Sequence, residues 1–417
     1  MLPAAFTIPG FAALWVSASS ASFARIVTQL ALSWITLEAT GSPFVVGVVT
    51  AARMVPQLVL GIPFGALADW LDRRLLVVAS NGLSVVLLLV LVGLSAGGLL
   101  TTPALVAVSV LYGVLDTLRM TATQSYAYDL VRSARATSGM ALTSFGTQLL
   151  GTMGGLVGGY TLERYGGPIT FGAIALAVLI ATVAPLVQPP SVGSDAPAGP
   201  DAPPSDPTPP SKPVERPSRR SRVDFRRAMT LVARNRLLTV LALAIILAEI
   251  FGFASQILLP TFARDVFDVG ASGLGIMMAV RSGGGALGLL VLSRLGAEGR
   301  SGLVFVSAAG AFGLALLLFG VTPAYAVALV LLGLSGLCAS VMDTLGQTLL
   351  QRNADEHERG AAMGLWVFSV GFGPVGHLTL GAAASAFGAP VTQAVSGLLL
   401  AVVAALMATH GPLRRAR

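Results

Sequence analysis

The chain has 417 residues, of which 54% are hydrophobic and only 11% are charged, and its mean hydropathy is +0.81. Soluble domains carry about 25% charged residues, so this composition excludes an ordinary soluble protein and indicates an integral membrane protein. The formal net charge of +7 could point to nucleic acid as a partner. We exclude nucleic acid because the basic residues lie beside apolar runs and not in a basic domain.

Residue types that carry enzyme chemistry are scarce. Lys212 is the only lysine and lies in a proline-rich stretch, which excludes a phosphate-binding loop of the Gly-Lys-Ser/Thr type. Three scattered histidines and the single cysteine, Cys338, offer no metal or cofactor constellation. We therefore expect a protein that is not an enzyme and has no cofactor and no metal.

Twelve apolar runs are long enough to cross a bilayer, which needs about 20 residues per helix. The first run lacks a basic leader and is too long for a signal peptide, so we interpret it as an uncleaved first helix. The runs, in chain order, are 9–37, 44–67, 75–97, 103–125, 138–161, 167–187, 236–262, 271–293, 302–320, 324–348, 362–384 and 390–410. The predicted fold class is an all-α integral membrane protein.

The connections between runs give the orientation. Twenty Arg and Lys residues lie in the even-numbered connections and the C-terminal tail, whereas the opposite connections hold only Arg164 and Arg264. Because cytoplasmic loops carry the excess of Arg and Lys, both termini are expected in the cytoplasm, and the location is the plasma membrane.

A proline-rich segment divides the chain. Residues 189–218 contain eleven prolines with Ser, Asp and Gly, which predicts an extended tether, while a proline-motif ligand for a partner domain is the alternative. The stretch 219–236 indicates a basic helix on the inner leaflet. The expected organisation is a six-run half over 1–188, a linker over 189–235 and a second six-run half over 236–417.

The two halves repeat at nearly constant offsets in residue number. Residues 28–32 resemble 255–259 at an offset of 227, and Asp116 with its two successors recurs at Asp343 at the same offset. Gly47 and Arg53 recur at Gly275 and Arg281 at an offset of 228, and the glycines of the run 138–161 recur in the run 362–384 at an offset of 222. Two parallel pseudo-symmetric six-helix halves predict a transporter whose site lies between the halves near the bilayer midplane.

Charges inside apolar runs are costly, about 2.5–3.5 kcal/mol each at a helix centre, so each needs a reason. The runs 75–97, 167–187, 302–320 and 390–410 have no charge near their centres and are expected to face lipid. The ionisable residues inside the remaining runs are Arg25, Arg53, Asp116, Arg119, Glu249, Arg281, Asp343 and His377.

Glu249 is the first candidate for proton coupling. It lies about 13 residues, roughly 20 Å, from the inner end of its run. A carboxyl that moves between a wet and a dry setting can take up and release a proton near neutral pH. The alternative is a static salt bridge with Arg281 on the neighbouring run.

The remaining buried charges have two interpretations each. Asp116 is a further proton-coupling candidate, but an intrahelical pair with Arg119 is the simpler interpretation. Gly346 stands where a matching arginine would pair with Asp343, which leaves Asp343 as a proton-coupling or inner-gate candidate. The cavity and substrate candidates, which would fit an anionic substrate or else bond backbone carbonyls, are Arg25, Arg53, Arg281 and Arg119. His377 is expected to satisfy helix packing.

The connection after the second run carries a motif. Gly65, Asp69, Arg73 and Arg74 resemble the G-x-x-x-D-[RK]-x-G-[RK]-[RK] signature of the major facilitator superfamily, with Trp70 and Asp72 as departures. The resemblance implies twelve helices in two halves and a gate that locks the cytoplasmic side through these residues. A solvated loop that follows the positive-inside rule is the alternative.

The run 138–161 carries a glycine motif. Gly151, Gly154, Gly155, Gly158 and Gly159 resemble the G-P-x-x-G-G antiporter signature of drug–proton exporters, with Gly155 in place of proline. Tight glycine packing between helices is the alternative interpretation.

The chain also resembles the exporter branch that includes enterobactin exporters and related drug–proton antiporters. The residues concerned are Trp34, the stretches 40–43 and 51–56, Gly47, and the stretch 359–364. A substrate does not follow from this similarity. Taking it together with the buried charges, we expect a monomeric, proton-coupled exporter of small amphipathic or anionic molecules, drug-like or siderophore-like. An importer or facilitator on the same fold, a non-transporting receptor and a membrane enzyme are the alternatives considered.

Overall fold

The computed structural model describes residues 11–186, 235–295, 301–354 and 358–409, and of residues 62, 66, 68–70, 73, 124–145, 185, 295 and 359 it describes the backbone alone. Every regular element in these residues is helical. The first group of helices is α1 (Phe11–Thr40), α2 (Pro43–Trp70), α3 (Arg73–Ala96) and α4 (Thr102–Leu186). The second group is α6 (Arg236–Phe251), η2 (Phe253–Leu258), α7 (Leu259–Thr261), η3 (Phe262–Val266), α8 (Gly270–Leu295), α9 (Ser301–Val321), α10 (Tyr325–Arg352), α11 (Arg359–Val370), α12 (Gly373–Phe387) and α13 (Ala389–Ala408).

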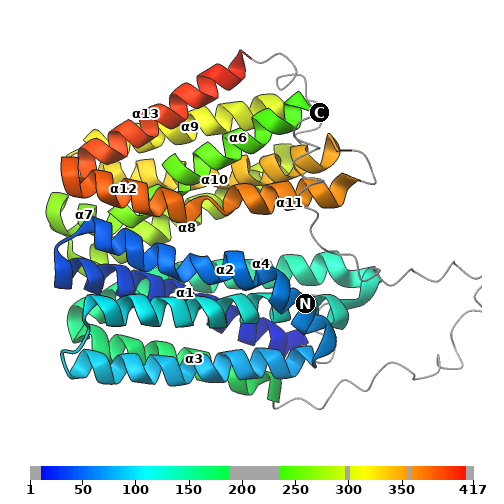
Figure 1. Ribbon diagram of the computed structural model, residues 1–417, viewed down its shortest axis with the longest axis vertical. Helices are drawn as coiled ribbons and strands as arrows, with labels where there is room; N and C mark the ends of the chain where they lie inside the picture. Colours follow the sequence, from blue (N-terminus) through cyan, green and yellow to red (C-terminus); the bar gives the residue numbers. More distant parts are fainter. Residues whose placement is uncertain (1–10, 187–234, 296–300, 355–357, 410–417) are drawn as a thin grey trace, which may run out of the picture.

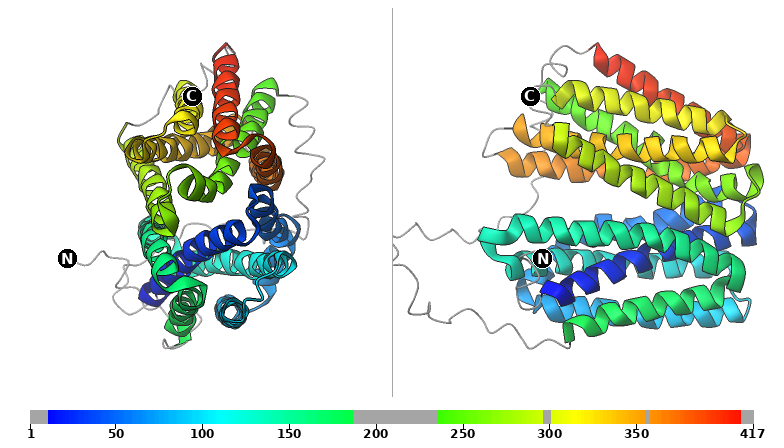
Figure 2. Two further views of the ribbon diagram at one scale, coloured as in Figure 1. Left: turned by 90° about the vertical axis from the view of Figure 1, so that its left-hand side faces the viewer. Right: turned by 180° about the vertical axis from the view of Figure 1, so that it is seen from behind.

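The predicted all-α membrane architecture is confirmed. Eleven stretches of the described chain are long and apolar enough to cross a membrane, against the twelve predicted. The difference lies in α4, whose 85 residues would measure about 130 Å if straight. Instead α4 folds back on itself (Figures 1 and 2) and contains three of the predicted runs. Gly166 has a φ of +75°, so the chain turns there without leaving helical structure, and Gly146–Ala184 counts as one stretch.

The helices form two groups that meet along one interface. α1, α2, α3 and α4 pack on each other, as do α6 and the helices from α8 to α13 (Figures 1 and 2). The main contacts between the groups are α4 with α8 and α2 with α12. The predicted linker and basic surface helix lie outside the described residues, so their boundaries stay a prediction.

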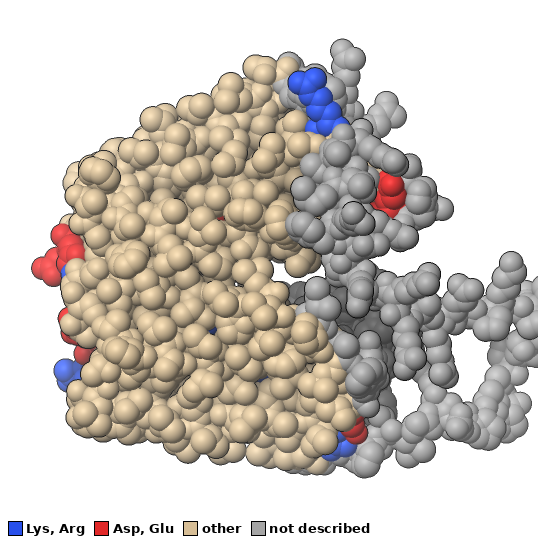
Figure 3. Space-filling view, in the orientation of Figure 1, with Lys and Arg blue, Asp and Glu red and all other residues tan. Residues whose placement is uncertain are grey.

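The two ends of the molecule differ. The closed end is the end where α1 finishes and α2 begins; there Val46 and Val49 of α2 are buried against the second group. The linker end is the opposite end, where α4 finishes and α6 begins; toward it Val59 of α2 is 64% exposed and Val367 of α11 is 56% exposed. The surface is hollowed between the groups at the linker end. Charged residues on the visible face gather at the two ends, with a band of uncharged residues between them (Figure 3).

Two of the predicted continuous runs are broken. The run 236–262 divides after α6 into a 3₁₀ stretch, one short α turn and a π turn. Pro260 has no N–H, so the carbonyl of Gln256 loses its α-helical donor, which favours a break there. The run 362–384 divides between α11 and α12 because Pro374 occupies the first turn of a new helix.

The four runs expected to face lipid lie on the outside of their groups. Their large apolar side chains are exposed along whole faces of α3, α9, α13 and the last part of α4, for example Leu83, Leu314, Leu398 and Ile180. A surface of this kind is stable only in hydrocarbon, which agrees with the predicted lipid contact.

Candidate functional site

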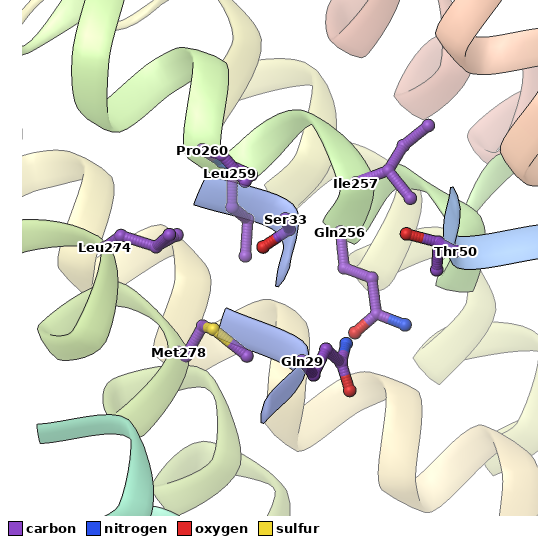
Figure 4. Close-up of a pocket in the computed structure, with 9 residues that line it drawn as sticks. All are labelled: Gln29, Ser33, Thr50, Gln256, Ile257, Leu259, Pro260, Leu274 and Met278. Carbon is purple, nitrogen blue, oxygen red and sulfur yellow. The ribbon is translucent and has the colours of Figure 1, made fainter. Parts of the chain in front are cut away.

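A pocket lies between the two groups near the closed end. Side chains from α1, α2, η2, α7 and α8 line it (Figure 4): Gln29, Ser33, Thr50, Gln256, Ile257, Leu259, Pro260, Leu274 and Met278. The side-chain amides of Gln29 and Gln256 point toward one another across the interface (Figure 4). Each amide offers both donors and an acceptor, so the pocket can hydrogen-bond a polar ligand from both halves.

The pocket follows the internal repeat. Gln29 and Gln256 stand at equivalent positions, related by the offset of 227, as do Ser33 and Pro260. Thr50 and Met278 are likewise equivalent in α2 and α8, at the offset of 228. These polar pocket residues were not among the predicted site residues. The signal was present, since a glutamine repeats at one position inside two apolar runs.

Arg53 of α2 extends the pocket. Its Nη2 donates a hydrogen bond to Gln29 Oε1 over 3.2 Å, while its Nη1 is buried without a hydrogen-bond partner. A buried guanidinium nitrogen without a partner is costly, so it is a place where a bound acceptor would gain energy.

The first group holds a cluster of partly buried charges from three helices. Asp116 of α4 forms an ion pair with Arg119 one turn later, which confirms the predicted intrahelical pair. The Asp116 carboxylate also interacts electrostatically with Arg53 and with Arg25 of α1, which is largely buried. Among the side chains that the structure describes, three arginines therefore share one acid here.

Arg281 of α8 occupies the place in the second group that Arg53 has in the first. A glycine of the neighbouring helix lies against the main-chain carbonyl of each arginine, Gly113 for Arg53 and Gly336 for Arg281. Arg281 Nη1 is also buried without a hydrogen-bond partner. No ion pair joins Arg281 to Glu249, two residues that the structure describes in full, so the static salt bridge is absent from this conformation.

Glu249 of α6 and Asp343 of α10 form the acidic part of the second group. Glu249 is only 8% exposed and interacts electrostatically with Asp343, and it forms no ion pair within the part of the chain that the structure describes. The Trp366 indole nitrogen lies close to the Asp343 carboxyl group but does not complete a hydrogen bond of normal geometry. The structure therefore brings together two of the three predicted proton-coupling candidates.

His377 lies on α12 beside α2. Its Nδ1 is 2.6 Å from the carbonyl oxygen of Gly373 in its own helix, whereas its Nε2 is buried without a partner. The main-chain carbonyl of His377 lies against Gly47 of α2. His377 thus takes part in packing between the groups, which is the interpretation expected from the sequence.

The glycines of the α4 motif lie on two faces of the helix, one against α1 and the other against α8. Gly154 and Gly158 lie against Phe23 and Val27 of α1, and Gly151 lies against Ser22 on the same face. Gly155 and Gly159 lie on the other face, against Gly275 and Ala271 of α8 in the second group. Close packing therefore accounts for all five glycines, and two of them form the contact between the groups.

The motif after α2 is described only in part. The side chains of Asp69 and Arg73 lie outside the described set, so their gating role stays a prediction. Asp72, a departure from the signature, caps α3, because its Oδ1 accepts from the N–H of Arg74 at 2.8 Å and of Leu75 at 3.3 Å. Arg74 Nη2 donates to the carbonyl oxygen of Leu186 at the end of α4 over 3.3 Å. At Gly65, a Cβ atom would meet nothing within 4 Å among the described residues, so close packing does not explain this glycine.

Two helix groups with a pocket of polar and apolar residues between them and hydrocarbon-facing outer surfaces are typical of a membrane transporter of the secondary type. The chain belongs to the Major Facilitator Superfamily, whose profile it matches over residues 14–375 and again over 241–416. It is therefore a transporter and not an enzyme. Among the described residues, no group of three or more His, Cys, Asp or Glu side chains is placed to hold a metal ion.

The relatives are distant. The chain is 24% identical over 382 residues to a staphyloferrin A transporter of Staphylococcus aureus, and the aligned region covers 89% of each protein. It is 25% identical over 363 residues to the enterobactin exporter EntS of Shigella flexneri, and the aligned region covers 86% of this chain and 80% of the exporter.

Solved structures share the fold. The nucleoside transporter NupG matches with a TM-score of 0.74 at 12% identity, covering 96% of this chain and 98% of NupG. A bacterial homologue of the lysosomal transporter Spinster, in an inward-facing and occupied conformation, matches with a TM-score of 0.72 at 15% identity, covering 97% of this chain and 96% of the homologue.

Proposed function

We propose that this transporter exports small amphipathic or anionic molecules by alternating access, driven by the proton gradient. The observation that carries the proposal is the pair of equivalent arginines, Arg53 and Arg281, each with a buried guanidinium nitrogen that has no hydrogen-bond partner among the described residues. Acceptor oxygens of an anionic substrate would satisfy both groups, one from each half. The pocket amides of Gln29 and Gln256 supply neutral contacts beside them.

The relatives support this substrate class. Two of them carry names for transporters of staphyloferrin A and enterobactin, and these similarities span most of both chains. We infer a siderophore-like or drug-like molecule with acidic groups for this chain. Residues 1–188 and 236–417 would act as the two rocking halves.

The orientation follows from the charge of the connections. The linker end would face the cytoplasm, together with both termini, because the connections and tail at that end carry most of the Arg and Lys. The structure would then be an inward-facing state, ready to take substrate from the cytoplasm. The gate formed by Gly65, Asp69, Arg73 and Arg74 would lock this end in the opposite state.

Glu249 and Asp343 are the favoured proton carriers. They lie within electrostatic range of each other without an ion-pair partner, whereas Asp116 is held by Arg119. A proton shared by the two carboxyls would be released when one of them becomes hydrated or when a cation approaches. Asp116 thus becomes the weakest of the three candidates. Each elementary charge that moves down the membrane potential gains about 2.3 kcal/mol per 100 mV, enough to drive export.

The test uses inverted vesicles that contain the purified protein. An inside-acid gradient is imposed, and a pH-quenched dye is followed while anionic chelators and amphipathic compounds are added. We expect one compound class to release protons, and Glu249→Gln to abolish this release in a protein that still elutes as a folded species. Glu38→Gln, which removes an exposed acid at the closed end, should leave the release unchanged. Full gradient-driven transport by Glu249→Gln would remove Glu249 from the mechanism.

An importer or facilitator on the same fold is the second candidate. Transport direction in oriented vesicles separates the two, since an importer would accumulate substrate in right-side-out vesicles under an inward proton gradient. The glycine sequence of α4 favours the exporter, because it resembles the antiporter signature, with Gly155 in place of proline.

A further inference from the structure

Two helices at the closed end receive their N-terminal cap from the other half of the molecule. The main-chain N–H of Ser272, in the first turn of α8, donates to Glu163 Oε2 of α4 over 2.6 Å. The main-chain N–H of Phe44, in the first turn of α2, donates to Ser385 Oγ of α12 over 3.0 Å. Both bonds cross the interface between the halves.

The two capped helices lack caps of their own. Val269, which precedes α8, has no acceptor in its side chain. Ser42 precedes α2 but makes no side-chain capping bond. The first N–H groups of an α-helix have no partner within the helix, so an acceptor from elsewhere stabilises the end. A carboxylate such as Glu163 gains further from the positive end of the helix dipole.

The two caps are equivalent under the internal repeat. Glu163 and Ser385 are related by the offset of 222, which also relates the glycines of α4 to those of α12. Phe44 and Ser272 are related by the offset of 228, which also relates α2 to α8. Because the two capping bonds stand at equivalent positions, they are part of the repeated architecture of the two halves. The cap from Glu163 is charged, whereas the cap from Ser385 is neutral.

A glycine one turn earlier brings each cap into reach. Gly159 lies against Ala271 and Gly275 of α8, and Gly381 lies against the start of α2 near Phe44. A residue four positions later lies on the same helix face, which places Glu163 and Ser385 over the neighbouring helix ends. The Glu163 carboxylate also lies directly over Gly270, where an added Cβ would be 2.6 Å from Oε2.

A third contact at the same end involves the C-terminus of a helix: a side chain of the second group donates to a carbonyl oxygen of the first group. Arg264 Nη1 of η3 donates to the carbonyl oxygen of Leu37, in the last turns of α1, over 2.7 Å. Asp265 holds the guanidinium through Nε at 2.6 Å and Nη2 at 3.0 Å. A cation is favourable at a helix C-terminus, so this contact also joins a helix end of one half to a side chain of the other.

We propose that Glu163 and Ser385 are a matched pair of gating residues that hold the closed end shut by capping the first turns of α8 and α2 across the interface. Opening this end breaks both bonds and leaves two helix ends uncapped. The closed state therefore gains stability at this end from groups that contact no substrate. The proposal rests on alternating access, but it concerns the balance of the two states and not the coupling ion or the substrate.

The test measures a distance, so it is independent of transport. Spin labels are placed at Leu99 and Val321, exposed residues of the two halves at the closed end, in a background in which the only cysteine is replaced by Cys338→Ser. Electron–electron distances are recorded in nanodiscs. We expect Glu163→Ala and Ser385→Ala each to raise the ratio of long to short distances about fivefold, and the double variant to combine the two effects.

Matched variants separate capping from general disturbance. Glu163→Gln keeps an acceptor oxygen and loses the charge, so its ratio should fall between wild type and Glu163→Ala. Glu38→Ala removes an exposed acid from the same end, and Thr379→Ala removes a hydroxyl of α12 that bonds within its own helix; neither should change the ratio. A double variant that elutes as a folded monomer with the wild-type distance distribution would overturn the proposal. A failure of proton-coupled export with an altered distribution would contradict the proposed function and leave the gating pair in place.

Discussion

Arg53 Nη2 and Gln29 Oε1 lie 3.2 Å apart and join α2 to α1 beside the pocket. Because this bond uses one guanidinium nitrogen and leaves Nη1 free, the arginine is oriented by the protein and still has capacity for a ligand. Arg281 supplies an equivalent unpartnered Nη1 from the other half, and it forms no ion pair among the described residues.

We expect Arg53→Gln and Arg281→Gln to weaken binding of an anionic substrate about ten- to hundredfold each. Hydrogen bonds to charged groups contribute about 1.5–3 kcal/mol, which sets this range. The measurement is the concentration dependence of vesicle transport for an anionic substrate and its neutral ester. Arg294→Gln, at the exposed end of α8, is the control. Equal losses for the acid and the ester would mean that the arginines act through structure and not through charge.

Asp116→Asn should destabilise the protein strongly. It leaves Arg119 buried without its ion-pair partner, and breaking a buried pair from one side costs about 3–5 kcal/mol. The melting temperature of the detergent-solubilised protein should fall, and Asp116→Asn combined with Arg119→Gln should recover part of the loss. Asp343→Asn should be tolerated far better, since Asp343 forms no ion pair among the described residues. An unchanged melting temperature for Asp116→Asn would show that the pair is dispensable.

Gly155→Ala and Gly159→Ala should push the halves apart at the closed end. An added methyl group at Gly155 would lie 3.1 Å from the carbonyl oxygen of Gly275, and backbone atoms cannot move aside cheaply. We expect slower transport together with wider distances between spin labels at this end. Gly82→Ala on α3 meets no atom within 4 Å and is the control. Wild-type transport by Gly159→Ala would mean that the contact is looser during the cycle than in this state.

Asp72→Ala should remove the cap of α3 at a cost of about 1 kcal/mol. Asp72→Asn should retain most of the stability, because the amide oxygen can still accept from Arg74 and Leu75. Thermal unfolding of the three proteins in one detergent gives the comparison. A loss as large for asparagine as for alanine would indicate that the charge of Asp72, and not its capping bond, matters.

The helices and the repeat were predictable because hydrocarbon imposes simple requirements on the chain. Runs of about 20 apolar residues can only become helices in a membrane, and glycines that recur at constant offsets mark equivalent helix contacts. The Asp116 and Arg119 pair followed from a spacing of three within one helix. Such features depend on local pattern alone.

The remaining features depend on how helices rotate and approach one another. Glu249 and Arg281 lie on adjacent predicted runs, yet the rotation of α6 brings Glu249 toward Asp343. The hydrogen bonds that Glu163 and Ser385 accept across the interface could not be predicted from the sequence. No local pattern indicates which side chain of one half lies beside which helix end of the other. The break at 252–266 was missed because hydropathy does not distinguish α-helix from 3₁₀-helix, although Pro260 marked the place.

The break after α6 means that the length of the segment 236–266 depends on the helical geometry of its middle part. The six residues Phe253–Leu258 form a 3₁₀ stretch, and each rises about 0.5 Å more than in an α-helix. A return to α-helical geometry would shorten this stretch by roughly 3 Å and rotate the chain beyond it by about a third of a turn. Gln256 lies in the stretch and lines the pocket, while Arg264 lies beyond it and holds the end of α1. A ligand that changes the winding of these six residues would therefore turn a local change of helical pitch into a pull on the end of α1 at the closed end.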